Sequence, residues 1–269
     1  MYLRVEHTTE FTYDSPIAEA YTELRLRPLE GGGQHCSSFR LATEPFGLRV
    51  REYHDHFGND VQHFDVLESH DRLSVTAVST VMTPDQLVGD ADPLSPLEFH
   101  DYLSPTGYAP FAGGVWDFAA RHTQNESGLA KAHEVMAAVR GELVYDPDAT
   151  DVQTRADEVL ELGRGVCQDF AHVMLATCRC AGIPARYVSG YLYDQKLVGD
   201  NAASHAWVDV WDEAVSGWAS LDPTHGRDQT DAYVRVAVGR DYADVPPTRG
   251  VFKGSAIETL SVRVGLQAL

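Results

Sequence analysis

The stretch that decides the fold is Gly163-Arg-Gly-Val-Cys-Gln-Asp-Phe-Ala-His-Val-Met-Leu-Ala-Thr-Cys-Arg-Cys-Ala-Gly-Ile-Pro184. Apolar residues recur in it at positions 167, 170, 171, 174, 175 and 178, the spacing of an amphipathic helix packed on a core. Glycines precede this helix, and residues 182–184 end it. Cys167 therefore lies in the first turn, where free backbone N–H groups and the helix dipole favour a thiolate. A buried structural cysteine is the alternative, and this interpretation suits Cys178 and Cys180.

Two short strands are predicted downstream, Ser204-His-Ala-Trp-Val-Asp-Val-Trp211 and Gly217-Trp-Ala-Ser-Leu-Asp-Pro-Thr224. If they form a hairpin with a tight turn at residues 213–214, His205 and Asp222 are direct cross-strand neighbours on one face. The carboxylate would then take one imidazole N–H and leave the other nitrogen for the sulfur. These are the parts of a cysteine nucleophile with its base and its orienting acid. A structural His–Asp pair is the alternative.

Four motifs follow one another along this half of the chain. They are Gly165-Val-Cys-Gln-Asp169, Ala181-Gly-Ile-Pro-Ala-Arg-Tyr-Val-Ser-Gly-Tyr191, His205-Ala-Trp207 and Leu221-Asp-Pro-Thr224. Their order and spacing resemble those of the bacterial transglutaminase-like cysteine proteins. The resemblance extends to Tyr145-Asp-Pro147, to Gly239-Arg-Asp-Tyr-Ala-Asp-Val-Pro-Pro247 and to the N-terminal region, so it covers nearly the whole chain.

The family is similar in fold to papain. The resemblance therefore implies that Cys167 is the nucleophile, His205 the base and acid, and Asp222 the residue that orients the histidine. It implies a peptide or protein substrate and no metal or organic cofactor. Water as acceptor would give a peptidase or amidase, which we favour, whereas an amine acceptor would give a crosslinking protein-glutamine transferase. A binding module with a vestigial triad is the third alternative.

Alternating runs with turn signals between them fill the N-terminal region and predict a small antiparallel sandwich. The runs are Leu3–Tyr13, Glu19–Pro28, Ser37–Thr43, Leu48–His56, Val61–Leu67 and Arg72–Met82. Prolines between residues 84 and 105 indicate a connector, so the predicted domains are residues 1–90 and 91–269.

Beyond the connector, helical spacing predicts helices over Val115–Thr123 and Leu129–Leu143. A strand is predicted at Val234–Val238, and the last alternating run, Ile257–Leu266, can pair with either sheet. The predicted fold class is α+β: an N-terminal antiparallel β-sandwich followed by a papain-like transglutaminase core with a C-terminal extension.

Composition limits the function classes. The 269 residues carry 40 acidic and 21 basic side chains, a net charge of −19. Such a surface repels phosphate backbones and anionic lipid, and it disfavours acidic macromolecular substrates unless a local basic patch overrides the field. We therefore expect no nucleic-acid partner. The N-terminus lacks an apolar run of signal-peptide length, no segment is long enough to span a bilayer, and the four cysteines show no disulfide framework, so we expect a cytoplasmic protein without a membrane partner.

Further site candidates rest on position. The backbone N–H of Cys167 is the first expected donor to an oxyanion, and the Tyr145 phenol is the second. Trp207 shares a strand face with His205 and would wall the cleft. Asp241 and Tyr242 lie in a polar stretch that would fold over the cleft. The alternatives are a packed tyrosine, a core tryptophan and an ordinary surface loop.

Three histidines on a predicted hairpin form a possible metal site. With a turn at Gly58-Asn59, His63 would lie opposite His54, and His56 would share their face. Surface histidines on a hairpin are the favoured alternative, so no metal is expected.

Overall fold

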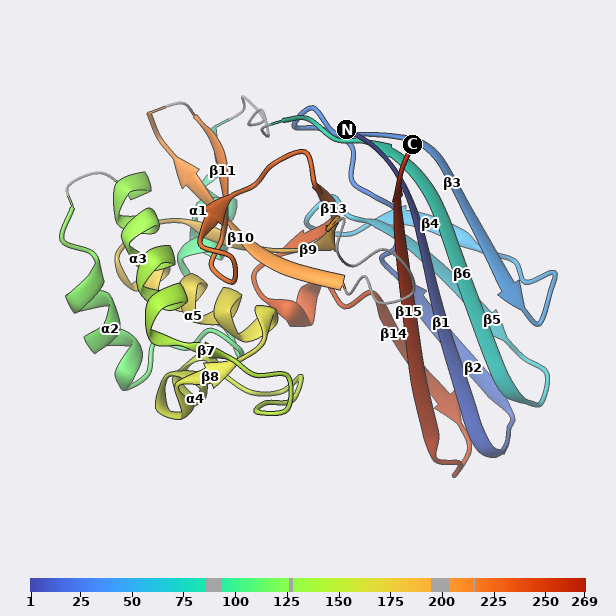
Figure 1. Cartoon of the computed structure of the whole chain (residues 1–269). Helices are drawn as coiled ribbons and strands as arrows, with labels where there is room; N and C mark the ends of the chain where they lie inside the picture. The colour runs from blue at the N-terminus through green and yellow to red at the C-terminus, as the bar shows by residue number, and fades with distance from the viewer. Residues whose placement is uncertain (86–92, 126–127, 195–203, 215) are drawn as a thin grey trace.

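The computed structural model describes residues 1–85, 93–125, 128–194, 204–214 and 216–269. Its α+β architecture has two stacked sheets on one side and a core of helices and a five-stranded sheet on the other (Figure 1). The predicted fold class is confirmed. In the described ranges no helix combines the length and apolarity needed to cross a membrane.

The strands are β1 Tyr2–Ile17, β2 Glu19–Leu24, β3 His35–Glu44, β4 Arg51–His54, β5 Asp60–Val66, β6 His70–Met82, β7 Val144–Tyr145, β8 Arg164–Gly165, β9 Ala185–Leu192, β10 Ser204–Asp212, β11 Gly217–Asp222, β12 Arg227–Asp228, β13 Tyr233–Gly239, β14 Thr248–Lys253 and β15 Glu258–Ala268. The helices are α1 Pro96–Leu103, α2 Gly114–His122, α3 Gly128–Glu142, α4 Ala156–Leu162 and α5 Cys167–Cys180, with a 3₁₀ turn, η2, at Tyr242–Asp244.

The sandwich is made from both ends of the chain. Its sheets have the strand orders β15-β1-β6-β3 and β14-β2-β5-β4, all antiparallel. Buried residues alternate along β1 and β6, so one face of each strand points into an apolar core that includes Phe11, Phe64 and Leu73. The last predicted run becomes β15, which pairs with β1 and brings the two chain ends side by side (Figure 1).

The core surrounds α5. Every residue from Asp169 to Arg179 is buried, because α2, α3 and α4 cover one side of the helix and β9 and β10 cover the other. The sheet has the order β12-β11-β10-β9-β13. The sequence predicts an amphipathic helix, and the structure shows one enclosed on nearly all sides.

Two side-chain amides join the sandwich to β13. Asn59 donates to the carbonyl of Val238 at 2.8 Å and accepts from its N–H at 2.7 Å. Gln34 makes the same double contact with the backbone of Arg235, at 2.9 and 2.8 Å. An apolar cluster from β1, β6, β9, β13 and β15 closes the rest of this junction. The predicted boundary between residues 90 and 91 lies outside the described residues.

The three hairpin histidines do not converge, so the metal site weighed as an alternative in the sequence analysis does not form from them. Strand β4 ends at His54 and β5 begins at Asp60, and this longer connection places His63 opposite Arg51. The Nε2 atoms of His54, His56 and His63 instead contact three different carboxylates, those of Asp60, Asp101 and Asp65.

Candidate active site

Cys167 is the first residue of α5, and its neighbours fix this position. The Oδ2 of Asp169 accepts the backbone N–H of Val166 at 2.7 Å and the Thr150 hydroxyl at 2.6 Å. Gly165 leaves room for this carboxylate, since a Cβ there would lie 2.5 Å from the same Oδ2. The carboxylate therefore holds the turn that presents the sulfur. Burial raises the pKa of Asp169 despite these hydrogen bonds.

His205 and Asp222 meet across the β10–β11 pair, with His205 Nε2 2.8 Å from Asp222 Oδ2. The predicted register is wrong by two residues, because Val208 pairs with Leu221 and not with residue 219. A two-residue shift keeps both side chains on the same face and makes them diagonal neighbours. The predicted contact therefore forms in a different register.

The Asp222 carboxylate is almost fully buried and accepts five hydrogen bonds. Its Oδ2 accepts from His205 Nε2 at 2.8 Å, His225 Nδ1 at 2.8 Å and Tyr233 Oη at 2.6 Å, and its Oδ1 accepts from the backbone N–H groups of Thr224 at 2.8 Å and His225 at 3.2 Å. Burial alone would raise its pKa, but the donors, above all His205 and His225, hold the pKa of Asp222 well below its ordinary value. The group is thus a fixed negative charge.

This charge controls His205. Burial opposes the imidazolium, but the hydrogen bonds to Asp222 and Cys167 and the charges of both outweigh it and raise the pKa of His205 to about 9. Because Asp222 occupies Nε2, Nδ1 is the nitrogen left for the sulfur. Trp207 lies behind the ring, with its centroid 5.9 Å away and the planes 28° apart. Trp207 is fully buried, so it backs the histidine and does not wall the cleft.

A pocket of about 370 Å³ opens beside the sulfur. Its lining residues are Arg140, Tyr145, Cys167, Leu192, Asp194, Ser204, His205, Thr224 and His225. Tyr145, the expected second oxyanion donor, is half exposed on β7 and lines the pocket, and burial together with the charge of Cys167 raises its pKa. The thiol, the imidazole and an accessible space for a carbonyl group therefore share one site.

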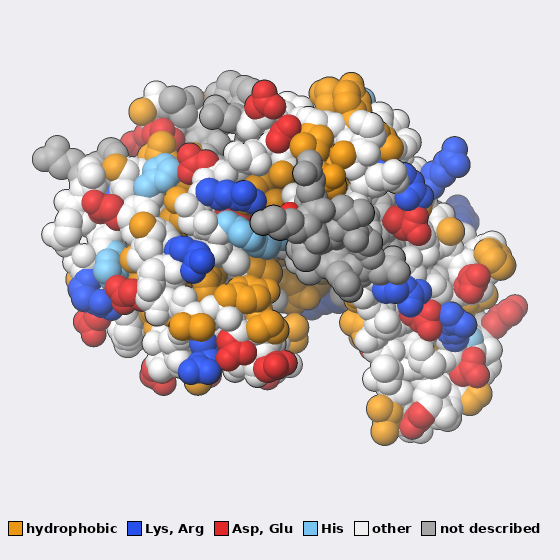
Figure 2. All heavy atoms as spheres, in the orientation of Figure 1, with side chains coloured by type: hydrophobic (Ala, Val, Ile, Leu, Met, Phe, Trp, Pro, Cys, Tyr) orange, Lys and Arg blue, Asp and Glu red, His pale blue; other side chains and the backbone are white. Residues whose placement is uncertain are grey.

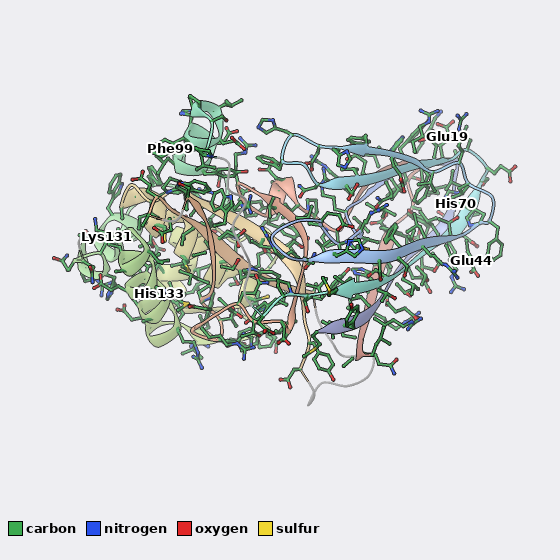
Figure 3. All side chains as sticks on the ribbon, turned by 90° about the horizontal axis from the view of Figure 1, so that it is seen from above. Glu19, Glu44, His70, Phe99, Lys131 and His133 are labelled. Atoms are coloured by element: carbon green, nitrogen blue, oxygen red, sulfur yellow. The ribbon has the colours of Figure 1, made fainter. Side chains whose placement is uncertain are left out.

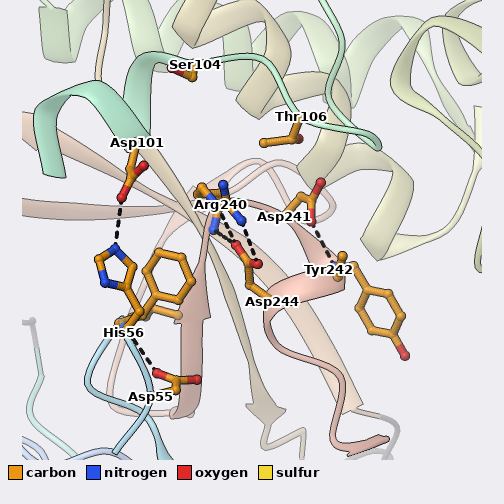
Figure 4. A network of polar contacts seen from close by, with 12 residues as sticks. Asp55, His56, Asp101, Ser104, Thr106, Arg240, Asp241, Tyr242 and Asp244 are labelled. Carbon is orange, nitrogen blue, oxygen red and sulfur yellow. Dashed lines mark hydrogen bonds and ion pairs between the residues drawn. The ribbon is translucent and has the colours of Figure 1, made fainter. Parts of the chain in front are cut away.

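Asp241 and Tyr242 do not line this pocket. Asp241 is buried and caps η2 by accepting the backbone N–H of Ala243 at 2.8 Å, and the N–H of Tyr242 donates to His172 Nε2 at 3.2 Å. Arg240 pairs with Asp244 nearby, as Figure 4 shows. The stretch predicted to fold over the cleft packs against α5 instead.

His225 and Tyr233 both hydrogen-bond to Asp222 and are missed by the sequence analysis. His225 directly follows the Asp-Pro-Thr motif, and this position in the sequence is the signal that could have identified it as a site residue. Tyr233 reaches Asp222 only through the pairing of β13 with β9, which no local pattern reveals. Ligand atoms of His205, Asp222 and His225 lie within 4.8 Å of one another, a spacing that would suit a metal ion. The hydrogen bonds to a single carboxylate oxygen already account for their proximity.

Comparison with known proteins agrees with this geometry. The model of the bacterial transglutaminase-like N-terminal region matches residues 3–82, and the model of the transglutaminase-like superfamily matches residues 117–223. An uncharacterized protein of Mycobacterium leprae is 36% identical over 99% of both chains. The chain belongs to the transglutaminase-like superfamily.

Other relatives of this transglutaminase-like chain match different fractions of its length. An uncharacterized Mycobacterium tuberculosis protein is 31% identical over 92% of this chain and 86% of its own. A protein-glutamine gamma-glutamyltransferase of Pseudomonas aeruginosa is 35% identical over 29% of this chain and 13% of its own. The crystal structure of a candidate cysteine protease from Cytophaga hutchinsonii has a TM-score of 0.76 and 22% identity, over 100% of this chain and 94% of that one, and shows the shared fold.

Proposed function

We propose that this protein is a thiol-dependent acyl transferase that acts as a hydrolase on peptide or carboxamide substrates. The observation that carries the proposal is the placement of the His205 ring at the wall of an open pocket, where Asp222 contacts Nε2 and Cys167 also hydrogen-bonds the ring. With a pKa of about 9, His205 is an imidazolium at neutral pH and can donate a proton to a leaving amine.

The reaction has two steps. The Cys167 sulfur attacks the carbonyl carbon, the C–N bond breaks, and the amine leaves with a proton from His205. A thioester remains. His205, now neutral, takes a proton from water as the water attacks the thioester, the C–S bond breaks, and the acid leaves while the Cys167 thiolate and the His205 imidazolium are restored.

Two donors are available to the oxyanion. The Cys167 amide lies at the start of α5, and no described residue accepts a hydrogen bond from it. The Tyr145 phenol lines the same pocket from β7. We propose that these two groups bind the oxyanion of the tetrahedral intermediate.

The local likeness to the Pseudomonas protein-glutamine gamma-glutamyltransferase supports one alternative, in which a primary amine resolves the thioester. The two reactions share every residue named above. The nature of the acceptor therefore has to be measured.

The test is incubation with a peptide library, with and without an added primary amine, followed by mass spectrometry. Cys167→Ala is expected to abolish all products, and Cys180→Ala, which alters a cysteine outside the pocket at the other end of α5, is the matched control. Cleavage or deamidation supports hydrolysis, and amine incorporation supports the transferase. Equal product from the wild type and Cys167→Ala, or none from either, would favour a binding module with a vestigial triad.

A further inference from the structure

The pocket carries a cation that the proposed reaction does not use. Arg140, in the last turn of α3, is exposed and lines the pocket with Cys167, His205 and His225. Within the described part of the chain, no residue makes a hydrogen bond or ion pair with its guanidinium. An arginine that lines the same pocket as the reacting sulfur, with its donors free, is available to a ligand.

The turn after Asp222 positions this side chain. Gly226 adopts a positive φ of 64°, and its N–H donates to the Asp222 carbonyl at 2.8 Å. The stem of Arg140 lies against this glycine, since a Cβ at Gly226 would be 3.1 Å from Arg140 Cγ. The same turn presents His225 to the pocket. The guanidinium is therefore held by the segment that completes the Cys-His-Asp site.

The local charge opposes that of the whole chain. The protein has a net charge of −19, yet the pocket brings together one arginine and two histidines, one of them the His205 imidazolium. Asp194 is the acidic side chain among the lining residues, and it already has an interaction of its own. Figure 2 shows histidine side chains flanked by Lys or Arg side chains in the middle of this face of the core.

We infer that Arg140 forms an anion subsite, and that the acyl donor bears a carboxylate close to the scissile carbonyl. A guanidinium presents its N–H donors in a fork that matches a carboxylate. The carboxylate comes from an acidic side chain or from a free C-terminus. This inference rests on the proposed function and names its substrate class. Arg140 is also the local basic group that attracts an acidic substrate to a protein whose surface is otherwise strongly negative.

Four bromoacetyl probes test the subsite without a known substrate. They are the bromoacetyl derivatives of glutamate and glutamine, each with a C-terminal carboxylate or a C-terminal amide. The Cys167 sulfur displaces bromide and forms a C–S bond, and mass spectrometry of the Cys167 peptide gives the rate. The glutamyl amide and the glutaminyl acid each differ from the neutral glutaminyl amide by one carboxylate. At least one of them is expected to react about ten-fold faster than the neutral probe, and the faster one identifies the source of the carboxylate.

The measured quantity is the rate ratio of charged to neutral probe, which cancels general effects of a substitution on the sulfur. Arg140→Gln is expected to bring this ratio close to one, and Arg140→Lys to retain part of it. Lys131→Gln removes one positive charge from the same helix and should leave the ratio unchanged, because Lys131 lies at the outer edge of the molecule (Figure 3).

Equal rates for all four probes in the wild type, or a ratio that survives in Arg140→Gln, would overturn the inference and leave the proposed function standing. Failure of the proposed function gives a different result. In that case the neutral probe would alkylate Cys167 no faster than it alkylates Cys180.

Discussion

Replacing Asp222 with asparagine tests whether the buried carboxylate is what charges His205. The pKa of His205 is about 9, against an ordinary value of 6.5. That difference corresponds to about 3 kcal/mol of preference for the imidazolium. Burial of the ring opposes the charged form and remains in the variant, whereas the negative charge on Nε2 disappears. The hydrogen bond and the charge of Cys167 also raise the pKa of His205 and remain in the variant, so in Asp222→Asn this pKa should fall clearly below its wild-type value of about 9.

The measurement is a pH titration of the histidine ring protons by NMR, with His205→Gln used to assign the His205 signals. His225 provides an internal comparison, because its Nδ1 also contacts Asp222 but its ring is more exposed. A His205 signal in Asp222→Asn that still titrates near pH 9 would refute the reasoning, since the carboxylate could not then be the cause of the shift.

The same shift predicts how stability depends on pH. The folded-state pKa of His205 is raised, so its contribution is fully present below pH 6.5 and is lost as pH rises to about 9 and beyond. Urea unfolding of the wild type and of His205→Gln at pH 6 and pH 10 isolates this contribution. The difference in unfolding free energy between them should shrink by about 3 kcal/mol over that range. A constant difference would contradict the prediction.

Three further changes have expected outcomes. Tyr233→Phe removes the hydroxyl that donates to Asp222 Oδ2 at 2.6 Å. The unfolding free energy measured in urea should fall by about 2 kcal/mol, and alkylation of Cys167 should become slower. An unchanged unfolding midpoint would contradict this prediction. Gly165→Ala places a Cβ 2.5 Å from Asp169 Oδ2 and should lower the unfolding free energy in the same assay by about 2 kcal/mol or more. A variant as stable as the wild type would show that the turn adapts to the added Cβ. Burial lowers the pKa of His7 to about 4, so folding favours its neutral form. Between pH 7 and pH 4 the unfolding free energy of the wild type should therefore fall by about 3 kcal/mol more than that of His7→Gln. Equal decreases in the two proteins would refute this.

The local patterns of the sequence predict most of the fold. Period-two runs locate the sandwich strands because one face of each strand is buried, and helical spacing together with the flanking glycines locates α5. The face shared by His205 and Asp222 is predictable for the same reason, since alternation fixes the face even where the register is wrong. The register itself depends on the length of the connection between Asp212 and Gly217, which the pattern does not specify.

The remaining parts of the site depend on tertiary packing. Tyr233 reaches Asp222 from a strand on the far side of β9, and Arg140 reaches the pocket from the end of α3. Neither has a local signal, because nothing in its own segment distinguishes it from an ordinary strand tyrosine or surface arginine. Asp241 is misassigned for a related reason: polar sequence predicts a loop, and here the carboxylate is buried as a cap.

The position of β14 and β15 has a consequence for biosynthesis. Both strands follow the core in chain order, and each completes a sheet begun by the N-terminal strands. During translation, β1 and β2 leave the ribosome long before their outer partners are made. Until then each presents an unsatisfied strand edge of the kind that pairs with other chains. Nascent protein is thus expected to depend on chaperones, and release after the Cys-His-Asp segment, but before β14, should yield insoluble chains.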